Sequence, residues 1–495
     1  MTDPLTPDWV RDAVFYQIFP DRFARSDQVA KPGPLEPWGS PPTPHGYQGG
    51  DLIGIVERLD HLVELGVTAL YMTPIFQSAS NHRYHTHDYE RVDPMLGGDA
   101  ALKRLLDACR ARGLRVVLDG VFNHASRGFF PFHDILENGR ESPYRDWFLV
   151  KSFPLNAYDA SRPPNYAAWW GLPALPKFNI ACPAAREYLL KIAEKWVEFG
   201  IDGWRLDVAN EIDDDEFWRE FRRRVRAKNP EAYIVGEVWS DAVRWLKGDM
   251  WDAVMNYQFT RACIAFYIGQ DAAAANLKKT SLHPAGPAGA EHFRLSIERL
   301  QRLYHPHVGA VMLNLIGSHD MARFLTLAGG DRSALLLATL FQATYSGAPS
   351  IYYGDEIGMT GGHDPANRGA FPWTTPATWD HEILAAFRRC FALRRDRPAL
   401  RRGSFQFLAA KGDLIAYMRK LDADVVVVVQ NSGHGTGRLE IEPTERIEDG
   451  TVLKECWGQG SIHYHKGIKQ EVLIGPRSSR VFATSQPTGW AESSK

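Results

Sequence analysis

The feature that most constrains the fold is a repeat of short apolar, β-branched runs separated by segments with helical periodicity. Each run has the length of a buried strand. The runs are Ala13–Phe19, Val67–Met72, Leu114–Leu118, Ile201–Leu206, Tyr233–Val238, Trp251–Met255, Ala310–Ile316 and Pro349–Tyr353. Strands that alternate with helices pair in parallel, and eight parallel strands close a barrel. We therefore expect an α/β fold, a (β/α)8 TIM barrel, with an open doubly wound sheet as the alternative.

One strand-helix unit shows the pattern in detail. Pro183 suits the first turn of a helix, apolar residues follow at helical spacing, and Gly200 suits the helix end. The strand run Ile201–Leu206 comes directly after, so Asp207 lies at its carboxyl end. In such barrels the chemistry takes place at that end.

The 495-residue length indicates more than one domain. The link after the third strand is far longer than a usual loop and is rich in aromatic residues and proline. The tail changes to short strand runs, at Ser404–Ala409, Leu414–Arg419, Val425–Gln430 and Val472–Thr484. We predict a first barrel part (1–121), an inserted small lobe (122–180), the remaining barrel (181–400) and a C-terminal antiparallel β-sandwich domain (401–495).

The balance of charges and the cysteine content indicate which kinds of binding partner and which redox state suit this chain. Lysine plus arginine (57) nearly balance aspartate plus glutamate (59), which removes the electrostatic motive for binding nucleic acid or a membrane. The five cysteines are scattered without CxxC spacing, so we expect reduced thiols. The first residues lack a basic-then-apolar signal, which predicts a cytoplasmic protein.

Four apolar runs are followed directly by acidic or imidazole residues. These segments are Asp119–His124, Gly203–Glu211, Ile234–Trp239 and Leu315–Asp320. Because barrel strand ends converge on one mouth, we expect the carboxylates Asp207, Glu237 and Asp320 to meet there. Such a set suits glycosyl transfer, in which one carboxylate attacks and another protonates the leaving oxygen. A lone acidic residue after a strand is more often a helix cap, which is the alternative for each one singly.

Together these segments resemble the four conserved regions of the α-amylase family (glycoside hydrolase family thirteen), in order and spacing. The resemblance extends from AVFYQIFPDRF near the start to the β tail. It implies that Asp207 is the nucleophile, Glu237 the general acid/base, and Asp320 the carboxylate that binds the sugar hydroxyls at the transition state.

The same resemblance implies a set of substrate-binding residues. Tyr84 would stack on the sugar ring, and Asp364 and Arg368 would bind the non-reducing side of the cleaved bond. The pair Trp169-Trp170, beside prolines in the long link, is expected to form a wall of the glucan cleft, with a core position as the alternative. Asp119 would support the site, and Arg205 would orient the nucleophile. His124 and His319 would donate hydrogen bonds to the sugar. The remaining two residues of the set are Glu211 and Trp239.

VANE (208–211) and LPKFN (175–179) resemble the neopullulanase, cyclomaltodextrinase and maltogenic amylase group. This implies retaining hydrolysis of α-1,4 bonds in cyclodextrins and maltodextrins, with pullulan and starch as further substrates and with transglycosylation. Alternatives are a 4-α-glucanotransferase, a general α-amylase, or an inactive binding protein. Because the barrel starts by about Val14, we expect the group's extra N-terminal β domain to be absent, which leaves monomer and homodimer open.

Metal binding is a minor alternative. His82, His85 and His87 could form a zinc site, but no cysteine or fourth ligand lies at metal spacing. Asn123 matches a calcium position of many relatives, whereas Ala209–Glu211 replaces the Lys-His pair that accompanies it. We expect no cofactor and no obligatory metal, with calcium as the alternative, and an oligosaccharide as the partner.

Overall fold

The computed structural model describes residues 6–159, 161–269, 277, 282, 289–442 and 444–485. By its internal contacts, the described chain divides into two compact units. The first unit holds the residues up to Trp9, Phe15–Met255 and Asp364–Thr378. The second holds Val10–Val14, Asn256–His363 and the residues from Trp379 onward.

Eight parallel strands alternate with helices along the described chain, as the apolar runs predicted. They are β1 (Phe15–Ile18), β2 (Ala69–Met72), β5 (Arg115–Gly120), β6 (Gly203–Leu206), β7 (Tyr233–Gly236), β8 (Ala253–Val254), β9 (Leu313–Leu315) and β10 (Ala348–Tyr352). They belong to one sheet, to which the first unit contributes β8-β7-β6-β5-β2-β1 in that order and the second contributes β10-β9. Each of the eight predicted runs therefore overlaps a strand of this sheet.

Long helices carry the chain between these strands. In the first unit they are α4 (Leu59–Leu65), α5 (Gly98–Ala111), α7 (Pro183–Phe199) and α8 (Asp215–Lys228), and in the second α11 (Ala290–Leu303), α14 (Arg332–Thr344) and α15 (His381–Asp396). Shorter helices are α1 (Trp9–Asp12), α2 (Pro20–Phe23), α3 (Leu52–Val56), α9 (Tyr257–Cys263), α12 (Pro306–Gly309), α13 (Phe324–Leu327) and α16 (Pro398–Arg402). One expected helix is missing, because the connection between β7 and β8 contains only turns.

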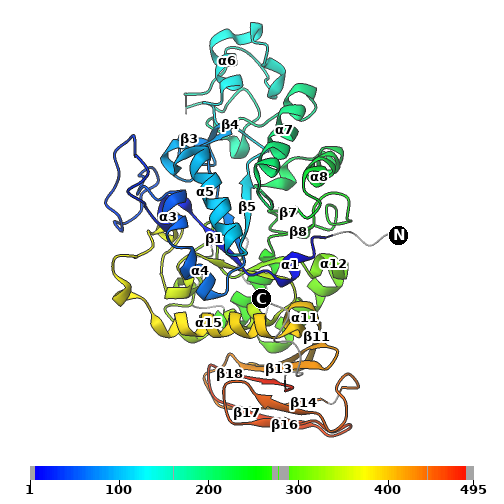
Figure 1. Cartoon of the computed structure of the whole chain (residues 1–495). Helices are drawn as coiled ribbons and strands as arrows, with labels where there is room; N and C mark the ends of the chain where they lie inside the picture. Colours follow the sequence, from blue (N-terminus) through cyan, green and yellow to red (C-terminus); the bar gives the residue numbers. More distant parts are fainter. Residues whose placement is uncertain are drawn as a thin grey trace. The chain divides into compact units, whose positions relative to one another are not determined.

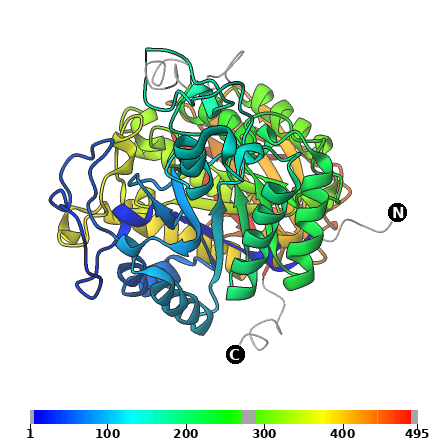
Figure 2. The same ribbon diagram turned by 90° about the horizontal axis from the view of Figure 1, so that it is seen from above.

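The helix α7 illustrates why these segments fold as they do. Pro183 occupies its first turn, and Gly200 ends it with a φ of 122°, a conformation that favours glycine. Leu189, Ala193 and Trp196 recur at helical spacing and are buried. The next helix, α8, packs against α7, and both are drawn in green in Figure 2.

Residues 122–180, here called the lobe, separate β5 from α7. Their one longer helix, α6 (Phe130–Asn138), is drawn in cyan in Figure 1. Aromatic packing holds the lobe, since the Phe132 ring lies 4.9 Å from those of both Phe148 and Tyr166. A hairpin of β3 (Phe76–Ser78) and β4 (Thr86–Val92) precedes it in the chain.

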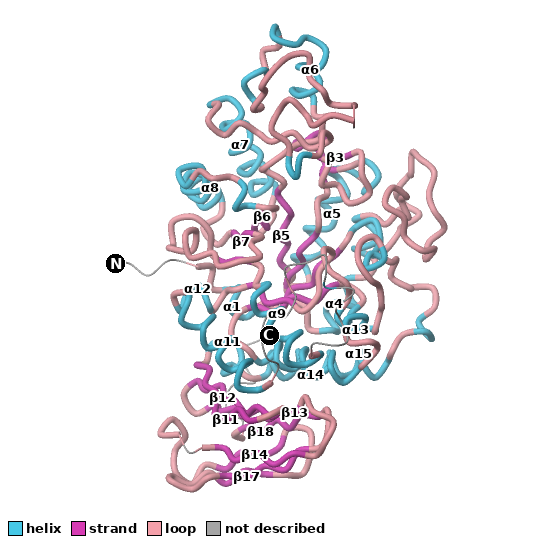
Figure 3. Tube along the Cα trace, turned by 180° about the vertical axis from the view of Figure 1, so that it is seen from behind, coloured by secondary structure: helices cyan, strands magenta, loops and turns pink. Residues whose placement is uncertain are grey.

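The chain ends in an antiparallel β domain of two sheets (Figure 3). One has the order β11-β12-β13-β18-β15-β16 and the other pairs β14 with β17. Their bounds are β11 (Ser404–Lys411), β12 (Leu414–Leu421), β13 (Asp424–Asn431), β14 (Gly437–Ile441), β15 (Val452–Glu455), β16 (Ser461–His463), β17 (Gln470–Ile474) and β18 (Ser478–Ala483). Alternate valines of β13 lie in the core that both sheets share.

The expectation of a single strand over Val472–Thr484 is wrong. The segment forms β17 and β18, which lie in different sheets. The break falls at Gly475-Pro476, where proline offers no N–H to a ladder, and Arg477 adopts a φ of 45°. The five cysteines are free thiols, as expected. No helix in the described ranges is long and apolar enough to cross a membrane.

Candidate active site

Strand register brings the acidic residues of the first unit together. Asp119 on β5 pairs directly with Arg205 on β6, so their side chains leave the sheet on the same face. Asp207 lies two residues beyond Arg205, on that face again, and Glu237 follows the neighbouring strand β7. Asp207 and Glu237 are 8% and 5% exposed, so this polar cluster is nearly shielded from water.

The guanidinium of Arg205 contacts three carboxylates. Its Nη1 lies 3.0 Å from Asp119 Oδ1 and 3.0 Å from Asp207 Oδ1, and its Nη2 lies 2.9 Å from Glu237 Oε2. Arg205 itself is completely buried. Retaining glycosidases place their two carboxyls roughly 5–5.5 Å apart. In this chain one planar guanidinium contacts both Asp207 and Glu237.

A strained residue links the ends of β6 and β7. Val208, directly after Asp207, has a φ of 38°, a left-handed conformation that β-branched residues rarely adopt. Its N–H donates to Glu237 Oε2 at 3.0 Å. The indole N–H of Trp239 donates to Glu237 Oε1 at 3.0 Å. Both oxygens of Glu237 are thereby oriented by donors next to the acidic cluster.

Asp119 lies at the base of the cluster. Tyr71 and Tyr84 donate their hydroxyls to its Oδ2 at 2.8 and 2.9 Å. Burial raises the pKa of Asp119 to about 6, against the lowering effects of Arg205 and the two tyrosines. Tyr84 thus contacts a carboxylate of the cluster, and Asp119 orients Arg205 and both tyrosines.

An aromatic stack lies within the lobe. The His124 ring stacks on Trp169 at 5.2 Å, and Trp169 stacks on Trp170 at 4.5 Å. Burial lowers the pKa of His124 to about 3, so its imidazole is neutral at physiological pH. Trp170 is 81% exposed, so the alternative that it is a core residue is wrong.

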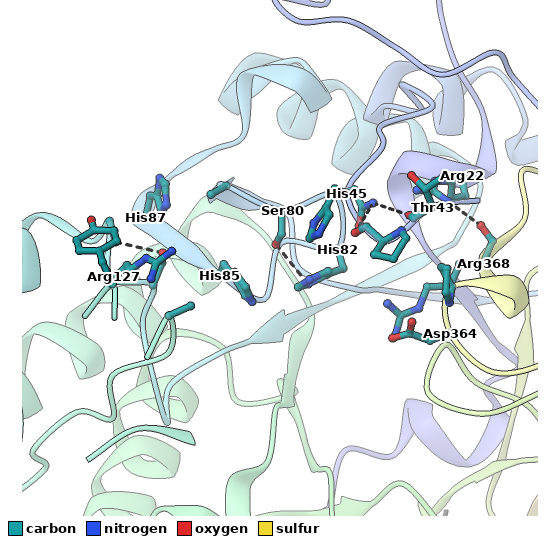
Figure 4. Close-up of a pocket in the computed structure, with 18 residues that line it drawn as sticks. Arg22, Thr43, His45, Ser80, His82, His85, His87, Arg127, Asp364 and Arg368 are labelled. Carbon is teal, nitrogen blue, oxygen red and sulfur yellow. Dashed lines mark hydrogen bonds and ion pairs between the residues drawn. The ribbon is translucent and has the colours of Figure 1, made fainter. Parts of the chain in front are cut away.

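Other predicted residues of the first unit form ion pairs. Glu211 accepts from Lys177 at 3.0 Å, which joins VANE to the LPKFN segment. Arg368 pairs with Asp364 at 3.3 Å, and both line a polar cavity of about 550 Å³ beside the hairpin that carries Tyr84 (Figure 4).

Asp320 and His319 belong to the second unit. They lie beside each other after β9, with His319 Nε2 3.2 Å from Asp320 Oδ2. Arg323 in the same loop donates to Asp355 Oδ1 at 2.7 Å and to the carbonyl of Tyr353 at 2.8 Å. Burial raises the pKa of Asp355 to about 7, against the lowering effect of Arg323. This buried pair ties the loop that carries Asp320 to the segment after β10.

The helix-cap alternative from the sequence fails for Asp207 and Glu237. The short turn η5 (Ala209–Glu211) that follows Asp207 has no side-chain cap, and Glu237 accepts from Val208, outside any helix. In the described part of the chain, no group of three His, Cys, Asp or Glu side chains is arranged to hold a metal ion. Tyr71 was missed, although a tyrosine near the end of a barrel strand is a signal in the sequence.

Comparison with known proteins agrees with this arrangement. The catalytic domain of α-amylase matches residues 17–395. A cyclomaltodextrinase from a Bacillus species is 48% identical over 86% of this chain and 74% of its own. An intracellular maltogenic amylase from Bacillus subtilis is 37% identical over 93% of this chain and 75% of its own. The crystal structure of a debranching enzyme from Nostoc punctiforme covers 98% of this chain and 100% of its own, at 46% identity and a TM-score of 0.88.

An eight-stranded parallel sheet with buried carboxylates at its strand ends, together with these matches, defines a glycoside hydrolase that acts on α-glucans. The chain belongs to the α-amylase family, with a TIM-barrel fold, an inserted lobe after the third strand and a C-terminal antiparallel β domain.

Proposed function

We propose that this enzyme hydrolyses α-1,4 bonds of cyclodextrins and maltodextrins with retention, with Asp207 as nucleophile and Glu237 as general acid/base. The observation that carries the proposal is the shared guanidinium of Arg205, which contacts both carboxylates at about hydrogen-bond distance. The division of roles between the two carboxyls follows the family resemblance, in which Asp207 matches the nucleophile and Glu237 the general acid/base.

The reaction proceeds in two steps. Asp207 attacks the anomeric carbon while Glu237 gives its proton to the glycosidic oxygen, so the bond to the leaving sugar breaks and a glycosyl ester forms. Glu237, now ionised, then takes a proton from water as the water oxygen attacks the same carbon, and Asp207 leaves as a carboxylate. When a sugar hydroxyl replaces water, the same step transfers the chain, which is the transglycosylation we expect. A 4-α-glucanotransferase is the alternative in which this transfer dominates.

The remaining roles rest on the family resemblance and the contacts above. Asp320 and His319 would bind the hydroxyls of the sugar at the cleaved bond. Tyr84 would support that sugar ring, and Trp170 would offer an exposed ring to the glucan chain. The cyclomaltodextrinase and the intracellular relative support cyclodextrin as substrate and a cytoplasmic location. The oligomeric state, monomer or homodimer, stays open.

A second candidate is cleavage of α-1,6 branch bonds. The match to the Nostoc debranching enzyme favours it, since this match covers that whole chain.

Substrate preference tests both candidates. We expect the wild type to hydrolyse β-cyclodextrin faster than starch, and Glu237→Gln to be nearly inactive on both. Initial rates of reducing-sugar release from β-cyclodextrin, starch, pullulan and a branched dextrin measure this. Much faster turnover of starch would instead indicate a general α-amylase, and preferential release of linear chains from the branched dextrin would favour debranching. Longer oligomers dominating early in a maltotriose reaction would indicate a transferase.

We also propose that activity needs no metal. We expect dialysis against a chelator to leave the rate on maltodextrin and the melting temperature within experimental error, because the proposed steps use only side chains and water. Calcium added back to the dialysed enzyme is the control. A loss of activity that calcium alone restores would show that the calcium alternative at Asn123 is correct.

A further inference from the structure

A cavity of about 400 Å³ lies in the second unit, at the amino ends of β9 and β10. Gly309 and Met312 on its wall precede β9, and Tyr345 and Ser346 precede β10. Asp320, by contrast, follows the carboxyl end of β9, so the cavity is separate from the residues of this unit that we assign to the substrate. Sites for small ligands typically have about 300–1,000 Å³.

The side chains around this cavity are basic or neutral. Arg11, His307 and Arg402 lie on its wall, together with Gln301 on α11 and Ser404 on β11. Among the described residues that line it, none is an aspartate or a glutamate. Another cavity of the same unit, beside β11 and β14, is lined by four glutamates. The lack of acidic side chains is therefore a property of this cavity and not of the whole unit.

The contact between Arg11 and His307 determines which imidazole nitrogen carries the hydrogen. Arg11 Nη2 lies 3.0 Å from His307 Nδ1. A guanidinium only donates hydrogen bonds, so Nδ1 is the acceptor and Nε2 holds the hydrogen of the ring. With Nδ1 occupied, the ring of His307 offers a ligand a donor and no acceptor.

Two further arginines lie behind the wall of the cavity. Arg394 on α15 and Arg419 on β12 are 0% and 1% exposed. Every hydrogen-bond acceptor that the described residues give to them is a backbone carbonyl. Arg394 donates to the carbonyl of Tyr345 at 3.2 Å, and Arg419 to those of Gly403 and Ser404 at 2.9 and 3.2 Å. The carbonyls of three residues that line the cavity are thereby engaged by buried cations.

These guanidiniums give the region an excess of positive charge. Burial lowers the pKa of Arg394 to about 9, with Arg419 and Arg401 adding to the effect, and burial lowers the pKa of Arg419 to about 10. Both arginines therefore remain cationic near neutral pH. The carboxylate of Asp12 is shared between Arg401 and Arg402. An anion in the cavity would reduce the excess charge, and charges attract more strongly away from bulk water.

We propose that this cavity binds a phosphate group, either as inorganic phosphate or as the phosphate of a small sugar ester. Guanidinium donors match the oxygens of phosphate in charge and in geometry. Tyr304 and Phe405 on the wall supply ring surface for the sugar of an ester. The cavity and the arginines behind it all belong to the second unit, and the proposal is independent of the proposed hydrolysis.

Calorimetric titrations of the full chain test the proposal near neutral pH and at constant ionic strength. The ligands are inorganic phosphate, glucose 1-phosphate and glucose. Gln301→Glu places a carboxylate in the lining with little change of shape, and Ser404→Trp places a bulky ring there. Gln470→Glu on β17, outside the lining, makes the same chemical change and is the matched control. Melting curves and rates on β-cyclodextrin show whether each variant is folded and active.

We expect the wild type and Gln470→Glu to bind inorganic phosphate and glucose 1-phosphate saturably. Gln301→Glu should weaken both affinities at least about tenfold, because its carboxylate repels the anion. Ser404→Trp should abolish binding of both compounds, and any binding of glucose should be the same in every protein. Tighter binding of glucose 1-phosphate than of inorganic phosphate would identify an ester as the ligand, and otherwise the ligand is the free anion.

Three results would overturn the proposal. The first is that the wild type binds neither phosphate compound saturably up to about 10 mM. The second is that Gln301→Glu and Ser404→Trp bind both compounds as tightly as Gln470→Glu does. The third is binding of glucose that Ser404→Trp removes, which would assign the cavity to a neutral sugar.

Discussion

An Asp207→Asn enzyme is expected to lose about 10,000-fold or more of kcat on maltooligosaccharides. The amide cannot form the glycosyl ester, and loss of a catalytic nucleophile costs on this scale. Arg205 remains in place 3.0 Å from the side chain, so the change removes the nucleophile with little change of shape. Asp213→Asn, on a 78% exposed side chain paired with Arg244, is the matched control and should keep full activity.

A substrate with an activated leaving group separates the two carboxylates. Fluoride leaves α-maltosyl fluoride without protonation, so Glu237→Gln should form the glycosyl-enzyme at a substantial rate from it. Asp207→Asn should stay inactive on the same compound, because the attacking oxygen is lost. If both variants behaved alike on the fluoride and on maltooligosaccharides, the division of roles would be wrong.

The second large effect is on stability. Arg205→Met should lower the free energy of unfolding by about 3–5 kcal/mol near neutral pH. Methionine fills the space, but Asp119, Asp207 and Glu237 lose the cation that all three contact. Urea unfolding measures the loss. Arg223→Met, whose side chain is 67% exposed and pairs with Glu220, should change stability by no more than about 0.5 kcal/mol.

The deficit of Arg205→Met should depend on pH. The pKa of Asp119 is already raised to about 6 in the wild type, and removal of a cation that lowers it raises it further. A carboxyl with a folded pKa above its unfolded value binds more protons in the folded state, so acidification stabilises the folded variant. The deficit should therefore be smaller at about pH 5 than at about pH 8. A deficit that is the same at both values would mean that lost packing, and not buried charge, causes it.

The sequence was most informative where local pattern and tertiary environment agree. Buried parallel strands are apolar on both faces, so an unbroken apolar run such as Tyr233–Val238 predicts where a strand lies in the sequence. The acidic residues Asp207 and Glu237 interrupt this pattern at strand ends, which is why they could be singled out. Arg205 could be placed on the same face as Asp207 from the two-residue period alone.

Features that depend on contacts between distant segments were not predictable. The hairpin β3–β4 and the lobe are stabilised by aromatic packing without a regular period, so the sequence did not show that His82 and His85 line a polar cavity. The stack of Trp169 on His124 joins residues 45 positions apart in the printed sequence. Gly475-Pro476 is a turn signal in the sequence, but the apolar residues on both sides of it favoured the prediction of one continuous strand.

The in-register pairing of Asp119 with Arg205 provides a way to recognise correctly refolded protein. A slip of β6 by a single position would rotate Arg205 and Asp207 away from Asp119 together, since alternate residues face opposite ways. Such a misfolded barrel could keep much of its hydrogen bonding yet would have lost its chemistry. The specific activity of refolded protein therefore measures the fraction of molecules in which β5 and β6 have paired in the native register.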